Sequence, residues 1–395
     1  MPWKEIDVMD QKKAFVLKSF DKSISFTALC KEYGITTKTG YKWKTRFLQD
    51  GYQGLEELSR KPIRAAHSVP EEIIFEIIRL KNKHRHWGAM KLLTLYNTMH
   101  PDWRHIVRST VDRILLKAGL CEKRKRTRRQ TPIRIQNRFI PKAPNDLWTV
   151  DFKGWWYTPD RERCEPLTVR DAYSRYILSI KILEKSDTSS VKQEFLRIFR
   201  QYGLPKVIRS DNGPPFASQF NVFSLTRLAV WWMSFGIKLD RIDPGSPYQN
   251  GAHERMHCDM KKELEGQIDG NLRYHQKVFD EWREEYNTER PHQALGNKTP
   301  ASIYCTSART FQEEIDRIEY PRGYKSRMVN DRGWMNFKSK RIFIGVPFSG
   351  YNVGIRSGKS DDYEIWFDDF CIGTIDAQTF DYKLPRWKLK EIIAQ

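Results

Sequence analysis

The chain has 395 residues, 39% of them hydrophobic and 13% aromatic, which is the composition of a globular protein long enough for two to four domains. Its net charge of +20 is uneven, since residues 1–142 contain 31 Lys and Arg against 14 Asp and Glu, whereas residues 143–395 contain 38 against 35. No apolar run approaches the roughly 18 residues of a membrane span, residues 1–5 lack a signal-peptide core, and the six cysteines form no Cys-x-x-Cys pair, which argues against a zinc knuckle and a disulfide framework.

The basic first third of the chain is expected to bind a polyanion, while the nearly neutral remainder carries the acids. A basic face that is merely solvated is the alternative. The helical patterning of the same region favours nucleic acid.

Residues 1–60 are predicted to form a helix-turn-helix domain. Phe26, Leu29 and Tyr33 lie on one helical face, Gly34 ends that helix, and residues 36–37 cap the next. A helical hairpin used only for packing would show the same pattern. In a helix-turn-helix the second helix enters the major groove, so its basic side chains would face DNA phosphates or base edges. These side chains are Lys38, Lys42, Lys44 and Arg46.

Residues 61–122 are predicted to form a second module of helix-turn-helix or winged-helix type. Residues 71–81 carry isoleucines at helical spacing, Trp87-Gly88 opens another helix, and Ser109-Thr110 caps a third. Two tandem modules would read a longer DNA site.

A basic linker is predicted over residues 123–142. Like charges repel, so the linker is expected to stay extended until an anion neutralises it, which suits a segment that follows the DNA backbone. A localisation signal is the competing interpretation of such a tract. The predicted DNA-binding residues here are Lys123, Arg124, Lys125, Arg126, Arg128 and Arg129.

Residues 143–310 are predicted to form an α/β core. Strands are expected over residues 147–152, 165–170, 176–183 and 206–209, with a helix over 189–202, which gives a mixed sheet covered by helices. Asn250-Gly251 then starts a long helix, and further helices are expected over 271–287 and 299–304. Residues 320–395 contain short strands separated by Gly, Asp and Ser turns, which predicts a small β-barrel.

Three carboxylates stand out in the core. Asp151 lies at the end of one predicted strand, Asp211 follows another, and Glu254 lies three residues after Gly251. Because each acid lies where an element ends or begins, distant segments could bring all three to one edge of the sheet. Oxygen ligands of this kind suit Mg²⁺ or Mn²⁺ together with water and substrate phosphate. The sequence therefore predicts a metal site, with DNA as the substrate.

The motifs around these acids resemble those of bacterial insertion-sequence transposases with a retroviral-integrase-like core. They read LWTVD at 147–151, SDNG at 210–213 and QNGAHER at 249–255, followed by YN at 286–287, RPHQAL at 290–295 and Pro300. The resemblance covers about residues 143–305 closely and the front modules more loosely. It implies an RNase H-like core and the acidic DDE triad Asp151, Asp211 and Glu254, which would hold two Mg²⁺ or Mn²⁺ ions per active site.

The resemblance also implies a reaction. Water would free the 3′-OH of the element, and this 3′-OH would then attack target DNA at the same site. Lys261 lies two helical turns after Glu254, where the family commonly places a basic residue that contacts DNA, and Arg255 is expected to contact DNA as well.

Some features depart from the family pattern or allow other interpretations. The 43-residue step from Asp211 to Glu254 is long, with the excess in residues 220–235, and Asp240 and Asp243 are nearer in sequence to Asp211, although they precede Pro244 in a loop. The front of the chain lacks the His and Cys zinc module of retroviral integrases.

His253-Glu254-Arg255-Met256-His257 spells the His-Glu-x-x-His pattern of zinc metallopeptidases. That hypothesis leaves Asp151, Asp211 and the basic region unexplained.

The tryptophan pairs at 155–156 and 231–232 fit either base stacking or packing in a core. Residues 171–175, Asp-Ala-Tyr-Ser-Arg, are expected to form a structural turn.

The expected function is that of a DNA transposase that binds terminal inverted repeats, cleaves DNA and joins the freed 3′ ends to a target. The expected partners are double-stranded DNA and further copies of the chain, at least a dimer on paired ends, with no membrane and no small-molecule substrate. A bacterial cytoplasmic location follows, on the nucleoid when DNA is bound. A DNA-binding regulator with an unused core is the alternative from another class.

Overall fold

The computed structural model describes residues 7–57, 69–122, 139–218, 224–243, 245–264, 270–313, 318–358 and 362–383. The chain divides into two compact units, residues 1–70 and 71–395. Among the described residues, no helix is both long and apolar enough to span a bilayer. The linker residues predicted to bind DNA, Lys123, Arg124, Lys125, Arg126, Arg128 and Arg129, lie outside the described ranges.

The first unit contains three helices and a short 3-10 turn. Thr36 caps α3 by accepting a hydrogen bond from the Thr39 backbone N–H at 3.2 Å, which is the start expected from the Thr36-Thr37 pair. The chain turns before it at Gly34, whose φ of 64° favours glycine. The elements are α1 (Val8–Lys18), α2 (Phe26–Glu32), α3 (Thr37–Asp50) and η1 (Gly51–Leu55), and their shared core consists of Phe15, Val16, Leu29, Cys30, Trp43 and Leu55.

Gly40 is a point of close packing between α3 and the other helices of this unit. A Cβ atom added there would lie 2.6 Å from Cys30 Sγ and 2.9 Å from Phe15 Cζ. We expect Gly40→Ala to destabilise the first unit by about 1–3 kcal/mol, since overpacking forces the core apart. Hydrogen exchange of the α3 amides in the full chain measures this. Gly88→Ala is the control, because a Cβ atom there meets nothing within 4 Å, and equal protection in both variants would contradict the prediction.

The second unit begins with three more helices close to those predicted. Each buries an apolar face, for example Ile77 of the first, Leu92 of the second and Val111 of the third, all with 0% exposure. The spacing of these residues is that of amphipathic helices. The elements are α4 (Glu71–Lys83), α5 (Ala89–Met99) and α6 (Arg108–Lys117).

A mixed five-stranded sheet forms the centre of the second unit. Its order is β5-β4-β1-β6-β7, with β1 antiparallel to β4 and parallel to β6, and β6 parallel to β7. The mixed sheet predicted from the sequence is therefore confirmed. Its strands are β1 (Leu147–Phe152), β4 (Pro166–Asp171), β5 (Ile177–Ile182), β6 (Val207–Ser210) and β7 (Lys238–Arg241), and a hairpin of β2 (Trp156–Tyr157) and β3 (Arg163–Cys164) is inserted between β1 and β4.

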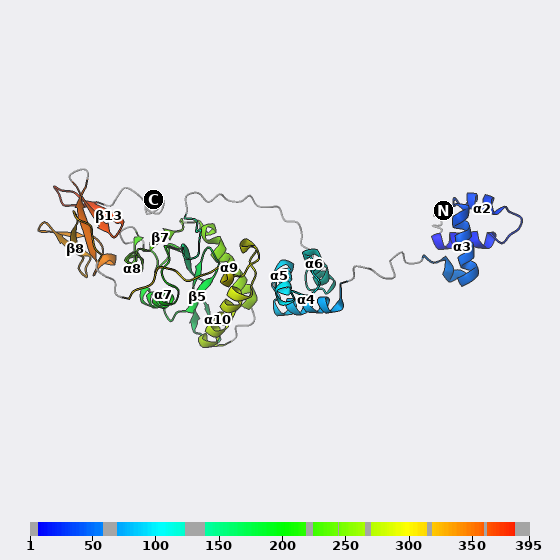
Figure 1. The fold of residues 1–395 in the computed structure, drawn as a ribbon, viewed down its shortest axis with the longest axis horizontal. Coiled ribbons are helices and arrows are strands. Elements are labelled where there is room, and N and C mark those ends of the chain that lie inside the picture. The colour runs from blue at the N-terminus through cyan, green and yellow to red at the C-terminus, as the bar shows by residue number, and fades with distance from the viewer. Residues whose placement is uncertain are drawn as a thin grey trace. The chain divides into compact units, whose positions relative to one another are not determined.

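Helices cover both faces of this sheet (Figure 1). On one face α7 (Thr188–Tyr202) and α8 (Arg227–Met233) pack Phe195, Phe199 and Trp232 against the strands. On the other face α9 (Gly251–Leu264) and α10 (Leu272–Thr288) contribute a second core that includes Met256 and Phe279. The helix predicted over 299–304 is only the 3-10 turn η5 (Pro300–Ser302), after η4 (Gln293–Leu295).

The C-terminal region contains an open sheet in place of the predicted barrel. Its strands have the order β14-β13-β12-β11-β8, and within the described residues the two edge strands do not pair with each other. Its buried side chains, such as Phe348 and Phe367, join the same core as α7 and α8. The elements are β8 (Lys325–Met328), β11 (Asn352–Ser357), β12 (Tyr363–Phe367), β13 (Phe370–Ile375) and β14 (Tyr382–Lys383), with a separate hairpin of β9 (Trp334–Phe337) and β10 (Lys340–Phe343) before η6 (Val346–Phe348).

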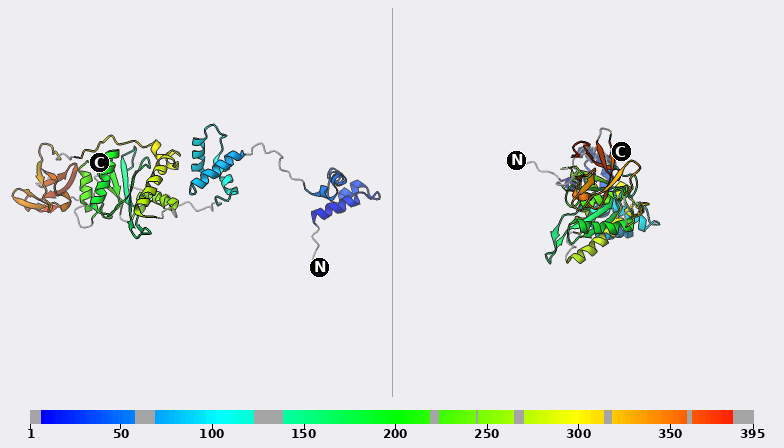
Figure 2. Two further views of the ribbon diagram at one scale, coloured as in Figure 1. Left: turned by 90° about the horizontal axis from the view of Figure 1, so that it is seen from below. Right: turned by 90° about the vertical axis from the view of Figure 1, so that its left-hand side faces the viewer.

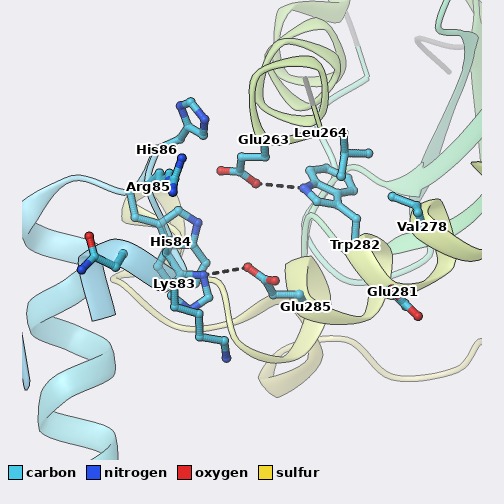
Figure 3. A pocket seen from close by; sticks show the side chains of 12 residues that line it. Lys83, His84, Arg85, His86, Glu263, Leu264, Val278, Glu281, Trp282 and Glu285 are labelled. Carbon is cyan, nitrogen blue, oxygen red and sulfur yellow. Dashed lines mark hydrogen bonds and ion pairs between the residues drawn. The ribbon is translucent and has the colours of Figure 1, made fainter. Parts of the chain in front are cut away.

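The connection between α4 and α5 contacts α10 through charged groups. His84 Nδ1 lies 2.9 Å from Glu285 Oε1, and Lys83 Nζ lies 2.9 Å from Glu289 Oε2. Figure 3 shows Lys83, His84 and Glu285 at a cavity of about 560 Å³ that is also lined by Glu263 and residues of α10. Burial alone would raise the pKa of Glu285, but its hydrogen bond to His84 and the nearby positive charges hold that pKa below its ordinary value.

Candidate active site

Two of the predicted acids lie at the same end of neighbouring parallel strands. The β1–β6 register pairs Trp148 with Ile208 and Thr149 with Arg209. Continued by two residues, this register places Asp151 beside Asp211, the residue that directly follows β6. Parallel neighbours end at one edge of a sheet, so the two carboxylates share that edge.

The third predicted acid, Glu254, is carried on helix α9, which is fixed to β1 and β4. His253 is fully buried and lies 2.8 Å from Thr149 Oγ1 through Nδ1 and 2.7 Å from Thr168 Oγ1 through Nε2. His257 Nε2 also lies 2.8 Å from Thr168 Oγ1. These contacts hold the first turns of α9, which include Glu254, across β1 and β4.

Thr168 is the centre of this hydrogen-bond network. Its hydroxyl donates to the Asp151 carbonyl oxygen at 2.9 Å, so its remaining lone pairs are free to accept from the two Nε2–H groups. With a single proton on each ring, at Nε2, both imidazoles are neutral. Burial, the largest cause, lowers the pKa of His257 to about 3 and that of His253 well below its ordinary value, which is consistent with neutral rings.

Sequence reasoning missed this network of two threonines and two histidines. Thr149 lies two residues before Asp151, hence on the same face of β1. The two-residue alternation of side chains along β1 is the sequence signal that could have placed Thr149 beside Asp151 in this network.

The electrostatics of Asp151 connect all three acids. Its pKa is raised to about 7, first by burial and then by the negative charges of Asp211 and Glu254. Burial likewise raises the pKa of Asp211. The site therefore holds more negative charge than its surroundings stabilise.

One carboxylate oxygen at this edge has no partner. Asp211 Oδ1 is buried without a hydrogen bond, and Gly213 leaves the space beside the same carboxylate, since a Cβ there would lie 3.0 Å from Oδ2. Among the described residues, no three His, Cys, Asp or Glu side chains lie close enough together to hold one metal ion. The acids therefore share an edge and influence one another without forming a closed ligand cluster.

The alternative third acids are engaged elsewhere. Asp240 lies in β7 and pairs with Arg209 at 2.6 Å. Asp243 accepts a hydrogen bond from the Gln249 side chain at 2.8 Å. Glu254, by contrast, is one of the charges that raise the pKa of Asp151.

The same hydrogen-bond network argues against the zinc-peptidase hypothesis. Both ring nitrogens of His253 and Nε2 of His257 face threonine hydroxyls. His257 Nδ1 faces Asp151 Oδ2 at 4.0 Å. The two histidines thus attach α9 to the sheet and do not present a pair of ligands to one ion.

The basic residues predicted in the first unit differ in their surroundings. Lys38 and Lys42 are exposed on α3. Lys44 instead donates to the Ser19 carbonyl oxygen at 2.7 Å, and Arg46 lies against the Trp43 ring with one buried nitrogen unpaired. The exposed face of α3 therefore carries Lys38 and Lys42.

Positive charge also lies near the acids. Arg255 is 73% exposed and pairs with Asp259 at 3.1 Å, and Lys261 is exposed on the same helix. Lys153, which sequence reasoning missed, is close enough to Asp151 and Lys261 for their charges to act on its pKa, which burial lowers.

The tryptophans fall into two groups. Trp231 and Trp232 belong to α8 and are buried in the core, and Trp156 packs on Phe279. Trp155 is 55% exposed on the β2–β3 hairpin, which stands out from the core as the blue-green hairpin of Figure 2. Core packing thus accounts for three of the four.

The segment 171–175 is a structural turn, as predicted. Asp171 accepts hydrogen bonds from the Asn145 backbone N–H at 2.8 Å and from the Ser174 N–H and hydroxyl at 2.7 and 2.6 Å. Arg175 completes the turn with a φ of 68°.

Comparison with known proteins agrees with this arrangement. Two models described as integrase core domain match residues 141–247 and 235–300. The chain thus contains an integrase core of the kind found in insertion-element transposases, as the sequence motifs predicted.

Several individual proteins are similar to parts of this chain. The chain is 28% identical over 234 residues to an uncharacterized 31.7 kDa protein of insertion element IS407 from Burkholderia multivorans, covering 59% of this chain and 80% of the relative. It is 24% identical over 260 residues to the transposase of insertion sequence element IS904 from Lactococcus lactis, covering 62% and 97%. A solved HTLV-2 integrase catalytic core in complex with magnesium is 20% identical, with a TM-score of 0.34 over 42% of this chain and 99% of that one.

Proposed function

We propose that the chain is a DNA transposase whose core cleaves DNA at the ends of an insertion element and joins the freed 3′ ends to target DNA. The observation that carries the proposal is the meeting of Asp151 and Asp211 at one end of parallel β1 and β6, with Glu254 on a helix fixed to β1 and β4. In this proposal the helices of the first unit and α4–α6 recognise the terminal inverted repeats. Lys38 and Lys42 would contact the DNA, and two or more copies would assemble on paired ends.

The residues at this edge fit divalent metal ions. The donors are carboxylate oxygens, and one of them, on Asp211, is buried without a partner among the described residues. The pKa of Asp151 is raised first by burial and then by the negative charges of Asp211 and Glu254. Asp151, Asp211 and Glu254 would hold Mg²⁺ or Mn²⁺, two ions per site. Bound ions would stabilise the charge that develops on the scissile phosphate and acidify the attacking hydroxyl.

The chain's own residues have separate tasks in this proposal. Thr168 and the two histidines of α9 orient the Asp151 backbone and the helix that carries Glu254. Lys153 lies near Asp151 and Lys261. The two lysines would attract the DNA backbone and hold the strand near the acids.

Two substitutions test the activity. We expect Asp211→Asn and Glu254→Gln each to reduce Mg²⁺-dependent nicking and joining of element-end DNA by at least about 10³-fold, because loss of groups that stabilise the transition state costs several kcal/mol. DNA binding should persist. Glu281→Gln, 66% exposed on α10, is the control and should retain activity. Nicking at the wild-type rate by the Asp211 variant would refute the proposal.

A further inference from the structure

A cavity of about 620 Å³ lies beside the N-terminus of α9, apart from the edge that carries the acids. Its described wall includes Arg170, Arg175, Arg209 and Lys298, and it includes no Asp or Glu. The backbone of Asn250, Gly251 and Ala252 forms another part of the wall. We call this space the arginine cavity.

Arg170 is the unusual residue in this cavity. It is only 2% exposed, its Nε is buried without a hydrogen bond, and among the described residues it makes no ion pair. Its guanidinium donates to the Ala252 carbonyl oxygen at 2.6 Å. A buried charge without a counter-ion is costly, so proteins nearly always pair it.

The acids near Arg170 do not supply that counter-ion. Asp171 uses its two oxygens on Asn145 and Ser174. Asp240 pairs with Arg209, and the other basic residues in the cavity wall are Arg170, Arg175 and Lys298. Burial, the largest cause, lowers the pKa of Arg170 to about 10. The charges of Arg175 and Arg209 act in the same direction, while those of Tyr286 and Asp171 oppose it, and Arg170 is still charged at neutral pH.

The helix that begins here adds to the positive potential. α9 is 14 residues long and starts at Gly251, and the unpaired N–H groups of a helix start favour anions. Arginine forks match the oxygens of a phosphate group. We propose that the arginine cavity binds a phosphate group, with Arg170 and Arg175 as its principal donors.

The source of the phosphate is suggested by the chain that enters the cavity. Ile140 and Pro141 line it, and Arg209 donates to the Phe139 carbonyl oxygen at 3.0 Å. Residues 139–141 directly follow the basic run of residues 123–138. If that run follows DNA to the core, a backbone phosphate would reach this cavity, and this assignment to DNA rests on the proposed function.

The first experiment uses inorganic phosphate and the full chain. Thermal unfolding is measured in phosphate and in chloride at equal ionic strength. We expect phosphate to raise the midpoint for the wild type, and Arg175→Asn to weaken phosphate affinity roughly 10- to 100-fold, since a charge-assisted hydrogen bond is lost. Asn tolerates the positive φ of 68° at this position. Arg161→Asn, an exposed arginine at φ 63° in the β2–β3 hairpin, is the matched control and should keep the full response.

A second variant separates a binding arginine from a structural one. Arg170→Met removes the buried charge and keeps the volume. In phosphate-free buffer its unfolding midpoint should equal or exceed that of the wild type, and its response to phosphate should disappear. A lower midpoint in chloride together with an unchanged response to phosphate would overturn the proposal, as would a wild type that does not distinguish phosphate from chloride.

The second experiment identifies the source of the phosphate. Binding to a 30-base-pair duplex is measured over a range of salt concentrations. If DNA supplies the phosphate, Arg175→Asn should reduce the slope of log affinity against log salt by about 1. An unchanged slope with a lost phosphate response would retain the anion site and reject DNA as its ligand. Neither experiment requires cleavage, so failure here is distinguishable from failure of the catalytic variants.

Discussion

Asp151→Asn is expected to make the metal-free protein more stable at pH 8 while removing its activity. The reason is that burial, and then the charges of Asp211 and Glu254, raise the pKa of Asp151 to about 7 in the folded chain. An unfolded Asp titrates near 3.9. Asparagine keeps the shape of the side chain and carries no charge, so it avoids this penalty.

The pH dependence follows from the direction of the shift. Below pH ~4 the carboxyl is protonated in both states and carries no penalty. Between ~4 and 7 the unfolded chain loses the proton and the folded chain retains it, so stability falls as pH rises. Above pH 7 the penalty is complete, about 2–4 kcal/mol at ~1.4 kcal/mol per unit. The side chain is 24% exposed, and the lower part of that range allows for solvent screening.

Urea unfolding at pH 5 and pH 8, with and without Mg²⁺, measures this prediction. The advantage of Asp151→Asn over the wild type should be larger at pH 8, and Mg²⁺ should stabilise the wild type more than the variant. Asp102→Asn, an exposed acid before α6, is the control and should change neither quantity. A variant less stable than the wild type at pH 8 would show that the carboxylate is well compensated without metal.

The core strands could be predicted from the sequence because their composition follows their burial. β1, β4 and β5 are rich in apolar and β-branched residues, and each lies within one or two residues of its predicted bounds. From the sequence, Asp151 and Asp211 were expected to share one edge of the sheet because each lies where a predicted strand ends. The register of β1 and β6 agrees with it.

Two elements between the second and third acids were missed for opposite reasons. α8 has the sequence Arg-Leu-Ala-Val-Trp-Trp-Met and buries six of its seven residues, so it lacks the polar face that marks an amphipathic helix. β7 reads Lys-Leu-Asp-Arg and lacks the apolar alternation of a strand, yet it forms the edge of the sheet beside β6. Asp240 is buried in it because Arg209 on β6 neutralises its charge. Pairing across 31 residues is not visible in a local pattern.

The same limit applies to the hydrogen-bond network and the arginine cavity. Thr168 meets His253 and His257 across 85 and 89 residues, and Arg170 meets Ala252 across 82. The β-barrel predicted for residues 320–395 is not confirmed, for a related reason. Short strands with polar turns describe an open sheet equally well, and closure depends on how the edge strands pair.

Arg290→Met is expected to cost about 3–5 kcal/mol of stability, because it would remove the buried cation that two partly buried carboxylates share. Arg290 is 3% exposed and lies 2.6 Å from Glu263 Oε2 and 2.7 Å from Asp259 Oδ2, both on α9. Its guanidinium also lies over the rings of Tyr286 and Trp87. One side chain thus joins α9 to α10 and to the α4–α5 connection, and its loss should loosen the helix that carries Glu254.

Chemical unfolding of the full chain measures the cost, and a triple variant identifies its cause. If uncompensated charge is the reason, adding Glu263→Gln and Asp259→Asn to Arg290→Met should recover a substantial part of the loss, whereas independent effects would add to it. Lys277→Met is the control. Lys277 is 71% exposed on α10, its Nζ lies 3.8 Å from Glu281 Oε1, and exposed pairs of this kind contribute about 0–1 kcal/mol. A loss below about 1 kcal/mol for Arg290→Met would mean that water replaces the guanidinium at little cost. The order of α9 would then depend on its contacts with the threonines of the sheet and on its packing against α10.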